Sequence, residues 1–352
     1  MNEGLITRLS NADAVACRET EVRAVMHEEL DDIADAVEYD KLGSIMFKSA
    51  GTEENPVRVL FTGHMDEAGF MVRYISDIGM VHVIGVGGPR KNSVESQIVR
   101  IKTRSGKKVR GVLFAKRADL ESQPGDMYID FGCETAEEVA ELGIQIGDWG
   151  TFDADCELKP VGDILLGKAF DDRAGVYVVT EAMKRLAGTP HAAELWFAGS
   201  SSEEVGCRGA ATAAAHLDAD IVIPVDIANA PEFTRNWENQ RKCGHGPMIV
   251  HYDRMHVPNE KMLHHIIDLA EKNNIPFQRD IFKGGGTDAG TAHLVGDGKL
   301  ATVIGVPVRY CHGSWSVMRG GDLDAAVDLV CAIATSIDRA TYEELKSFDY
   351  PP

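Results

Sequence analysis

The alternation of short apolar runs with helical segments constrains the fold of this chain more than any other feature. From Leu165 onward, runs typical of buried strands alternate with segments that have helical periodicity. Strands that alternate with helices predict a mostly parallel sheet that is covered by helices on both faces. The expected strands are 194–200, 220–225, 276–282 and 301–304, and the expected helices are 174–186, 208–216, 261–273 and 321–345.

The earlier half of the chain divides into two kinds of sequence. An acidic segment at 19–39 has apolar residues at helical spacing, and the runs 57–62 and 70–75 have the composition of strands. Between Gly79 and Asp163, short strands and frequent turns are typical of a small β-barrel or β-sandwich. The simplest architecture is therefore one α/β domain, residues 1–73 and 164–352, interrupted by a β-rich insertion at 74–163.

Charge and cysteine content exclude several classes of function. The 352 residues include 36 Lys and Arg against 55 Asp and Glu, a formal net charge of −19. Such a chain repels phosphate backbones and anionic lipids, so we expect no nucleic-acid or membrane partner. No apolar run approaches the roughly 18 residues of a membrane span, and no signal-peptide pattern is visible. Seven scattered cysteines without a C-x-x-C pair indicate reduced thiols and a cytoplasmic location.

Histidines and carboxylates follow four of the predicted strands. In open α/β sheets, ligands bind beyond the carboxyl ends of the strands. Four strand ends that bring imidazole and carboxylate groups to one edge therefore predict a functional site there. These residues are His64 and Asp66 after 57–62, Glu203 and Glu204 after 194–200, Asp226 at the end of 220–225, and His312 after 301–304.

Each of these residues also has a simpler interpretation. Asp171 directly precedes a predicted helix, so it is either a fifth member of the set or a helix cap. Adjacent acids such as Glu203 and Glu204 often form a solvated face, although this pair ends an apolar strand. A lone histidine is often a core or surface residue, but a carboxylate two residues after His64 suits a metal-binding imidazole. The histidines at 251, 256, 264 and 265 lack such a context, and we interpret them as surface or core residues.

Two histidines with three carboxylates suit a pair of divalent transition-metal ions, of which Zn, Co and Mn fit these donors. A bridging carboxylate would hold the ions about 3.5–4 Å apart, as in co-catalytic hydrolases, and would favour a bridging hydroxide near neutral pH. A free glutamate would take the proton of that water and pass it to the leaving amine. The glycine-rich segment 283–288 lacks the order of a phosphate loop, and 200–202 lacks a nucleophile elbow, so nucleotide binding and serine hydrolysis are rejected.

Six motifs together resemble the tetrahedral aminopeptidases, a family of cytoplasmic, dodecameric di-metal peptidases. The family includes glutamyl and deblocking aminopeptidases, and some members have been labelled endoglucanases. The matching pieces occur in the family's order and span nearly the whole chain. They are GHMDEAGFMV at 63–72, FDDRAG at 170–175, EEVG at 203–206, VD at 225–226, GGTDAG at 285–290 and PVRYCH at 307–312.

The resemblance implies a zinc-peptidase type of catalytic domain, with a dimerisation domain at the position of the β-rich insertion. It also implies two divalent metal ions per subunit and a homododecamer built from dimers, whose internal cavity admits short peptides. Departures from the family pattern lie at 12–21, Ser202 and Gly313, and none removes a ligand. By motif, His64 and Asp226 would hold one metal, Glu204 and His312 the other, Asp171 would bridge them, Glu203 would be the general base, and Asp66 would orient His64.

The expected function is a metal-dependent aminopeptidase that removes N-terminal residues from short peptides. A carboxylate-based glycosidase is one alternative, but it needs two isolated carboxyls and usually aromatic platforms, and aromatic residues make up only 7% of the chain. A non-catalytic assembly subunit is the other, and loss of Glu203 or a ligand would have marked it. The sequence leaves the choice of metal and the side-chain preference open, although Arg235, Arg241 or Lys242 would favour acidic residues if they reached the cleft.

Overall fold

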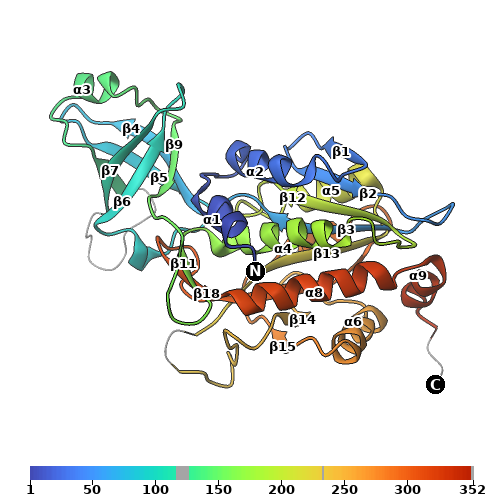
Figure 1. The fold of residues 1–352 in the computed structure, drawn as a ribbon. Helices are drawn as coiled ribbons and strands as arrows, with labels where there is room; N and C mark the ends of the chain where they lie inside the picture. Colours follow the sequence, from blue (N-terminus) through green and yellow to red (C-terminus); the bar gives the residue numbers. More distant parts are fainter. Residues whose placement is uncertain (116–126, 232–233, 350–352) are drawn as a thin grey trace.

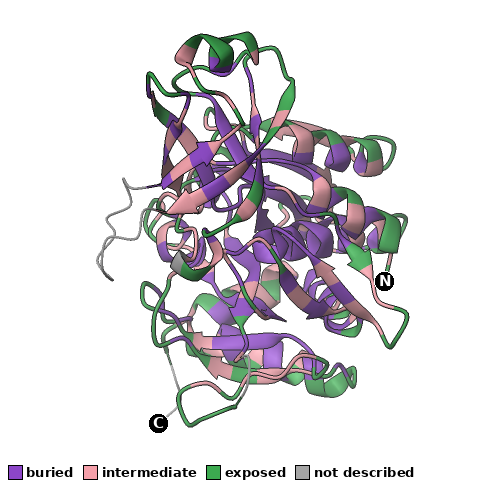
Figure 2. Cartoon of the chain, turned by 90° about the vertical axis from the view of Figure 1, so that its left-hand side faces the viewer, coloured by how far each residue is buried: buried purple, intermediate pink, exposed green. Residues whose placement is uncertain are grey.

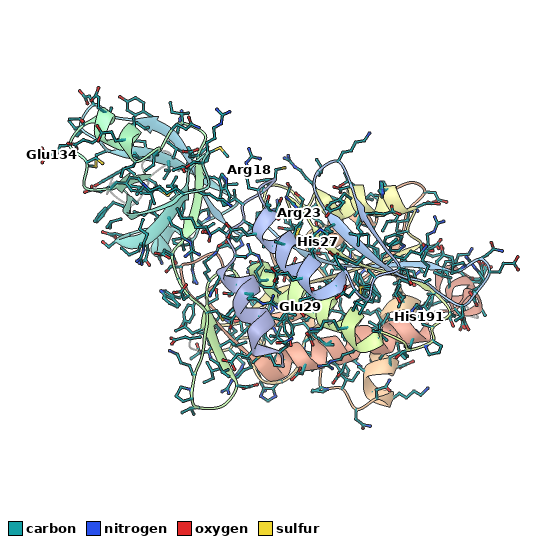
Figure 3. All side chains as sticks on the ribbon, turned by 45° about the horizontal axis from the view of Figure 1, so that its top comes forward. Arg18, Arg23, His27, Glu29, Glu134 and His191 are labelled. Carbon is teal, nitrogen blue, oxygen red and sulfur yellow. The ribbon has the colours of Figure 1, made fainter. Side chains whose placement is uncertain are left out.

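The computed structural model describes residues 1–115, 127–231 and 234–349 of the chain. Within them, a nine-stranded sheet forms the centre of the larger part of the molecule, and a closed six-stranded barrel stands at one end (Figure 1). Glu134 lies at the outer end of the barrel and His191 at the opposite end of the molecule (Figure 3). Among the described residues, no helix is both long and apolar enough to cross a membrane.

The large sheet is mostly parallel at its centre. Its order is β1-β2-β12-β3-β13-β17-β14-β15, and β16 pairs with β13. Strands β12, β3, β13 and β17 run parallel to one another, whereas β2 and β14 are antiparallel to their neighbours β12 and β17. The strands are β1 (Ala36–Tyr39), β2 (Ile45–Ser49), β3 (Arg58–His64), β12 (Glu194–Ser200), β13 (Ile221–Asn229), β14 (Met248–Tyr252), β15 (Gln278–Ile281), β16 (Leu300–Ala301) and β17 (Val303–Val308).

Helices cover both faces of this sheet because its central strands are apolar on both sides. Alternate residues of a strand point to opposite faces, so Val59 and Phe61 pack in one core while Leu60 packs in another. The first core joins α1, α2, α4, α6 and α8, and the second lies under α5; Figure 2 shows this interior as buried. The helices of this part are α1 (Glu3–Asn11), α2 (Thr20–Leu30), α4 (Phe170–Leu186), α5 (Gly209–Leu217), α6 (Glu260–Lys272), α7 (Ala289–Ala292), α8 (Gly320–Ser336) and α9 (Arg339–Lys346).

The barrel has its own apolar core and strand order β4-β5-β8-β7-β6-β9. Its strands β6 and β7 form a hairpin around the Ser105–Gly106 turn. The elements of the barrel are β4 (Gly69–Ile75), β5 (Val81–Val86), η1 (Lys91–Ser93), β6 (Gln97–Lys102), β7 (Lys108–Ala115), β8 (Met127–Asp130), α3 (Ala136–Glu141) and β9 (Trp149–Phe152). A small sheet of β10 (Glu157–Leu158), β11 (Ile164–Gly167) and β18 (Ser316–Arg319) follows it.

The fold class predicted from the sequence is confirmed, but two helix predictions are wrong in extent. The predicted helix at 19–39 ends at Leu30, and the rest of that segment contains the edge strand β1. The predicted helix at 321–345 is two helices, because the chain leaves helical geometry at Ile337 and Asp338 caps α9 through the backbone N–H of Thr341. In both cases apolar residues continue at helical spacing beyond the residue at which the helix ends.

Helix α4 packs directly against strand β3, backbone to backbone. A Cβ atom built on Gly63 would lie only 2.3 Å from the carbonyl carbon of Gly175. The approach requires glycine at both positions, because any larger side chain would push the strand and the helix apart. The contact places the carboxyl end of β3 beside the first turn of α4, where residues of the predicted site lie.

Candidate metal centre

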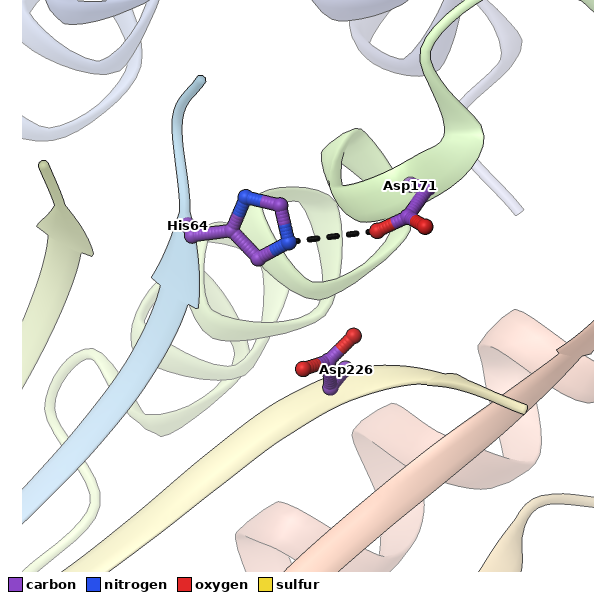
Figure 4. Close-up of side chains that lie close together, drawn as sticks. All are labelled: His64, Asp171 and Asp226. Atoms are coloured by element: carbon purple, nitrogen blue, oxygen red, sulfur yellow. Dashed lines mark hydrogen bonds and ion pairs between the residues drawn. The ribbon is translucent and has the colours of Figure 1, made fainter. Parts of the chain in front are cut away.

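All the residues predicted as metal ligands lie together at the carboxyl end of the parallel strands. Figure 4 shows the imidazole of His64 and the carboxylates of Asp171 and Asp226 turned toward a shared space. The site therefore lies where open α/β sheets place their ligands. His64 ends β3, Asp171 begins α4, Glu203 and Glu204 follow β12, Asp226 lies within β13, and His312 follows β17.

The ligand atoms form two groups of three that share Asp171. One group is His64, Asp171 and Asp226, the other is Asp171, Glu204 and His312, and within each group the atoms lie within 4.8 Å of one another. Nε2 of His64 lies 3.1 Å from Oδ1 of Asp171, and Nε2 of His312 lies 3.1 Å from its Oδ2. The two oxygens of one carboxylate thus face the two groups separately.

Hydrogen bonds hold both histidines with Nε2 turned toward the centre. Nδ1 of His64 donates to the backbone oxygen of Asp66 at 2.9 Å, and Nδ1 of His312 donates to that of Gly88 at 2.8 Å. Because each Nδ1 carries the hydrogen, each neutral imidazole offers Nε2 as a ligand. The backbone N–H of His64 also donates to Oδ2 of Asp172 at 3.0 Å, which ties β3 to α4.

Asp66 contacts the ring of His64 and, through its carboxylate, also the loop after β12. Its Oδ1 lies 3.6 Å from Nδ1 of His64, so the backbone oxygen of Asp66 makes the shorter contact with the ring. Its carboxylate also accepts the backbone N–H groups of Glu203 at 3.0 Å and Glu204 at 3.1 Å. Asp66 therefore holds the loop after β12 against the loop after β3.

The site concentrates negative charge in a buried place. Burial raises the pKa of Glu204 and that of Asp226, each to about 7. Burial alone would lower the pKa of His312, but Asp171 and Glu204 raise it to about 10. The pKa of His64 is likewise raised well above its ordinary value, against the effect of burial, chiefly by Asp171. Protons on the imidazoles here compensate the charge that divalent cations would compensate.

The residues present fit a pair of divalent metal ions. Oε1 of Glu204 is buried without a hydrogen-bond partner and lies 3.4 Å from Nε2 of His312. A buried carboxylate oxygen left unpaired is costly, and a cation between these two atoms would satisfy both. Imidazole with carboxylate donors suits Zn²⁺, Co²⁺ or Mn²⁺.

Glu203 lies beside the ligands without belonging to either group of three. Its Oε2 is 3.9 Å from Nε2 of His64, and its Oε1 accepts a hydrogen bond from the thiol of Cys207 at 2.9 Å. Burial raises the pKa of Glu203 well above its ordinary value. A carboxylate with this environment is suited to take and return a proton.

A pocket of about 370 Å³ opens over the centre. Beyond the site residues, its lining includes Ile227, Asn229, Arg241 and Phe282 together with the glycine-rich segment 284–287. The segment that the sequence analysis rejected as a phosphate loop therefore forms a wall of the pocket. Such a concave space beside perturbed carboxylates is where a substrate is expected to bind.

Arg241 lies in the pocket wall, and its positive charge is paired with the carboxylate of Asp280. Its Nε pairs with Asp280, its Nη1 donates to the backbone oxygen of Asn229 at 2.9 Å, and its guanidinium carbon lies 4.4 Å from the ring centre of Phe282. Arg235 is exposed and Lys242 lines a neighbouring pocket. An ion pair in the wall makes the pocket less attractive to an acidic side chain than a free arginine would.

Sequence reasoning missed three residues that hold the site. Asp172, rather than Asp171, caps α4: its Oδ1 accepts the N–H of Gly175 at 2.8 Å. Cys207 contacts Glu203, and the buried carboxylate of Asp288 accepts the hydroxyl of Ser200 at 2.6 Å. Asp172 and Asp288 lie within the motifs at 170–175 and 285–290, and Cys207 directly follows the motif at 203–206, so position in or beside a motif was the available signal.

Comparison with known proteins gives consistent matches over nearly the whole chain. The family model described as M42 glutamyl aminopeptidase matches residues 43–329. A "putative aminopeptidase" of Acetivibrio thermocellus is 33% identical over 93% of this chain and 96% of its own length. A glutamyl aminopeptidase of Lactococcus lactis is 30% identical over 97% and 98%.

Solved structures agree with these relatives. A TET aminopeptidase from the archaeon Thaumarchaeota archaeon SCGC AB-539-E09 matches with a TM-score of 0.93 at 32% identity, covering 97% of this chain and 98% of that one. The TET1 peptidase of Pyrococcus horikoshii, which can assemble into a tetrahedron or a large octahedral shell, matches with a TM-score of 0.84 at 27% identity, covering 95% and 99%.

Proposed function

Because this chain belongs to the M42 glutamyl aminopeptidase family, we propose that it removes N-terminal residues from short peptides at a centre that holds two divalent ions. The observation that carries this proposal is the pair of three-residue groups that share Asp171. A single carboxylate with one oxygen toward each group is suited to bridge two ions. Peptide hydrolysis by such a pair needs a general base and a substrate pocket, and both lie beside the groups.

The ligands divide between the two ions as follows. His64 and Asp226 would hold one ion, Glu204 and His312 would hold the other, and Asp171 would serve both. When bound, the ions supply Lewis acidity toward the scissile carbonyl and lower the pKa of water. Zn²⁺ is the first choice, with Co²⁺ and Mn²⁺ as the alternatives.

Glu203 acts as the general base. Its carboxylate accepts the proton of the attacking water and passes it to the nitrogen of the leaving amine as the peptide bond breaks. The thiol of Cys207 orients the carboxylate through its hydrogen bond to Oε1. Asp66 keeps Glu203 in place by accepting its backbone N–H.

We further propose that the chain assembles as a homododecamer built from dimers. This proposal is supported by its membership of the M42 family and its likeness to TET peptidases. The division into a catalytic domain, predicted as 1–73 with 164–352, and a dimerisation domain, predicted as 74–163, belongs to this proposal. The barrel itself runs from β4 (Gly69–Ile75) to β9 (Trp149–Phe152), so its first strand begins before the predicted boundary. The barrel, with its separate core, is the part suited to that second role. All seven cysteines are free thiols, which supports a cytoplasmic location.

A panel of aminoacyl chromogenic amides, with a short free peptide and an N-blocked copy, tests the proposal. The protein is assayed after chelation and after Zn²⁺, Co²⁺ or Mn²⁺ is added back. We expect metal-restored cleavage of the free-amine substrates alone, and a loss of roughly 10²–10⁴-fold in kcat for Glu203→Gln without loss of metal binding. Full activity in Glu203→Gln would remove the base assignment. A protein that binds two ions and cleaves nothing in the panel would favour a non-catalytic assembly subunit.

A further inference from the structure

Four buried charged residues lie beside the candidate centre without belonging to either group of ligands. Asp13, Glu67, Lys168 and Arg173 are each no more than 3% exposed. We call this cluster the Glu67 bridge. Buried charges are costly unless they are paired, and their pairing does not by itself add stability over apolar residues of similar volume. Their position next to the ligands therefore calls for an explanation other than stability.

The Glu67 bridge joins the chain segments that carry two residues of the first group, His64 and Asp171. Nζ of Lys168 donates to Oε1 of Glu67 at 2.6 Å, and Nη2 of Arg173 donates to the same oxygen at 3.1 Å. Nε of Arg173 also donates to the backbone oxygen of Met65 at 3.0 Å. The segment after β3 is thus bound to the residues on both sides of Asp171.

Two hydrogen bonds of opposite direction also link the two segments. Oδ2 of Asp172 accepts the backbone N–H of His64, while Arg173 donates to the backbone oxygen of Met65. Two consecutive residues of one segment thus bind two consecutive residues of the other. A reciprocal pair of this kind holds the backbone that carries His64 against the backbone that carries Asp171.

The N-terminal segment completes the bridge. Nη1 of Arg173 donates to the backbone oxygens of Leu9 and Ala12 at 3.1 and 3.0 Å, at the end of α1. The backbone of Glu67 pairs with Ala14, whose oxygen accepts the N–H of Glu67 at 3.0 Å. A cation at a helix C-terminus is favourable, so α1 adds to the anchoring of Arg173.

The bridge continues into the barrel through Asp13. Its carboxylate lies 3.2 Å from Nζ of Lys168 and accepts Arg100 of β6 at 2.7 Å and Thr151 of β9 at 2.9 Å. Lys108 of β7 lies 2.7 Å from its other oxygen. Burial alone would raise the pKa of Asp13, but these cations hold it well below its ordinary range.

We propose that Glu67 is a positioning residue: clamped by Lys168 and Arg173, it fixes the His64 segment against the Asp171 segment and so sets the affinity of the centre for divalent ions. The inference deepens the proposed function, since it takes the two groups of ligands to be a metal site. The physical reason is preorganisation. The carboxylates of Asp171, Asp226 and Glu204 repel one another when they are held together. If contacts within the fold already hold them in place, ion binding does not have to offset this repulsion, and the affinity for the ion is higher.

The test compares Glu67→Gln with a matched variant, Glu29→Gln. Glu29 of α2, labelled in Figure 3, also receives one arginine and one lysine, Arg8 of α1 and Lys184 in the last turn of α4. Both substitutions remove one paired charge and keep the shape of the side chain. Only the first lies at the ligand segments.

The measurement is the affinity of the chelated protein for Zn²⁺ by competition with a chromogenic chelator, with the visible absorption of added Co²⁺ as a second readout. We expect Glu67→Gln to weaken Zn²⁺ binding by about 10- to 100-fold and to alter the Co²⁺ spectrum. Glu29→Gln should bind Zn²⁺ within about twofold of the wild type. Wild-type affinity in Glu67→Gln, whatever its loss of stability, would show that the bridge is only structural and would overturn the inference.

A double variant, Glu67→Gln/Lys168→Met, covers the case in which Glu67→Gln does not fold. It removes the charges of Glu67 and Lys168 together, and Arg173 keeps its hydrogen bonds to the backbone oxygens of Met65, Leu9 and Ala12. We expect it to fold and still to bind Zn²⁺ weakly, because the frame is lost. Wild-type affinity in the double variant would overturn the inference. Since no substrate is used, a wild-type protein that binds two ions but cleaves no peptide refutes the proposed function and leaves this inference standing.

Discussion

Gly63→Ala tests whether the backbone contact between β3 and α4 sets the geometry of the centre. The new Cβ would lie 2.3 Å from the carbonyl carbon of Gly175 and 2.4 Å from the nitrogen of Val176, whereas ordinary contacts begin at 3.4 Å. The opposing atoms are backbone, so no side chain can rotate away. Helix α4 must therefore move by about 1 Å, which takes Asp171 away from His64.

The magnitude follows from this displacement. Overpacking of a filled core costs about 1–3 kcal/mol in the free energy of unfolding, and a backbone clash belongs at the upper end. A shift of about 1 Å in a catalytic group costs up to roughly 10²-fold in kcat/KM. We expect both losses together, because one movement causes both.

Urea unfolding of the chelated protein and kcat/KM of the metal-loaded protein measure the two effects. Gly4→Ala serves as the control: the Cβ there meets nothing closer than Oδ1 of Asn2 at 3.7 Å. Alanine within α1 should raise the free energy of unfolding by about 0.5–1 kcal/mol and leave kcat/KM unchanged. An unfolding midpoint and an activity equal to the wild type in Gly63→Ala would refute the reasoning.

Three further predictions concern charge. Asp280→Asn should raise cleavage of glutamyl relative to leucyl amides by roughly tenfold, because Arg241 then faces the pocket uncompensated; an unchanged ratio in kcat/KM would exclude Arg241 from the specificity pocket. Burial lowers the pKa of His256 to about 4 in the folded chain, so as the pH falls the unfolded chain is protonated at this histidine before the folded chain is. The free energy of unfolding therefore decreases by up to about 3 kcal/mol as the pH falls from about 6.5 to 4. Urea unfolding measured at pH 7 and at pH 5 should show a smaller fall in stability for His256→Gln than for the wild type. Chelation should lower Tm reversibly, since bound ions stabilise only the folded chain; a Tm indifferent to added Zn²⁺ would contradict a metal site.

The sequence predicted the parts of the structure that depend on local pattern. Buried parallel strands are continuous apolar runs, so β3, β12 and β13 and the polar residues that follow them could be read directly. His64, Glu203, Glu204 and Asp226 were proposed as site residues because they lie at the ends of those strands. The β-rich insertion could be recognised because its turns and short strands differ from the α/β sequence on either side.

The parts that could not be predicted depend on contacts between distant segments. Lys168 and Arg173 are buried, whereas lysine and arginine are usually found at the surface, so the sequence favours an exposed position for both. That Asp172 rather than Asp171 caps α4 depends on the turn that begins this helix. The end of α2 at Leu30 depends on the pairing of β1 with β2, which apolar spacing alone does not reveal.

The barrel interrupts the chain between two residues of the proposed metal centre, His64 and Asp171, and this placement implies an order of events during synthesis. His64 and Asp171 are 107 residues apart, with every strand of the barrel between them, and His312 emerges long after both. Domains fold as units while the chain is being made, so the barrel core can close before the centre has its bridging carboxylate. Contacts between distant segments form late. Aminopeptidase activity is then the last capacity that the chain acquires, because it needs residues from both sides of the barrel.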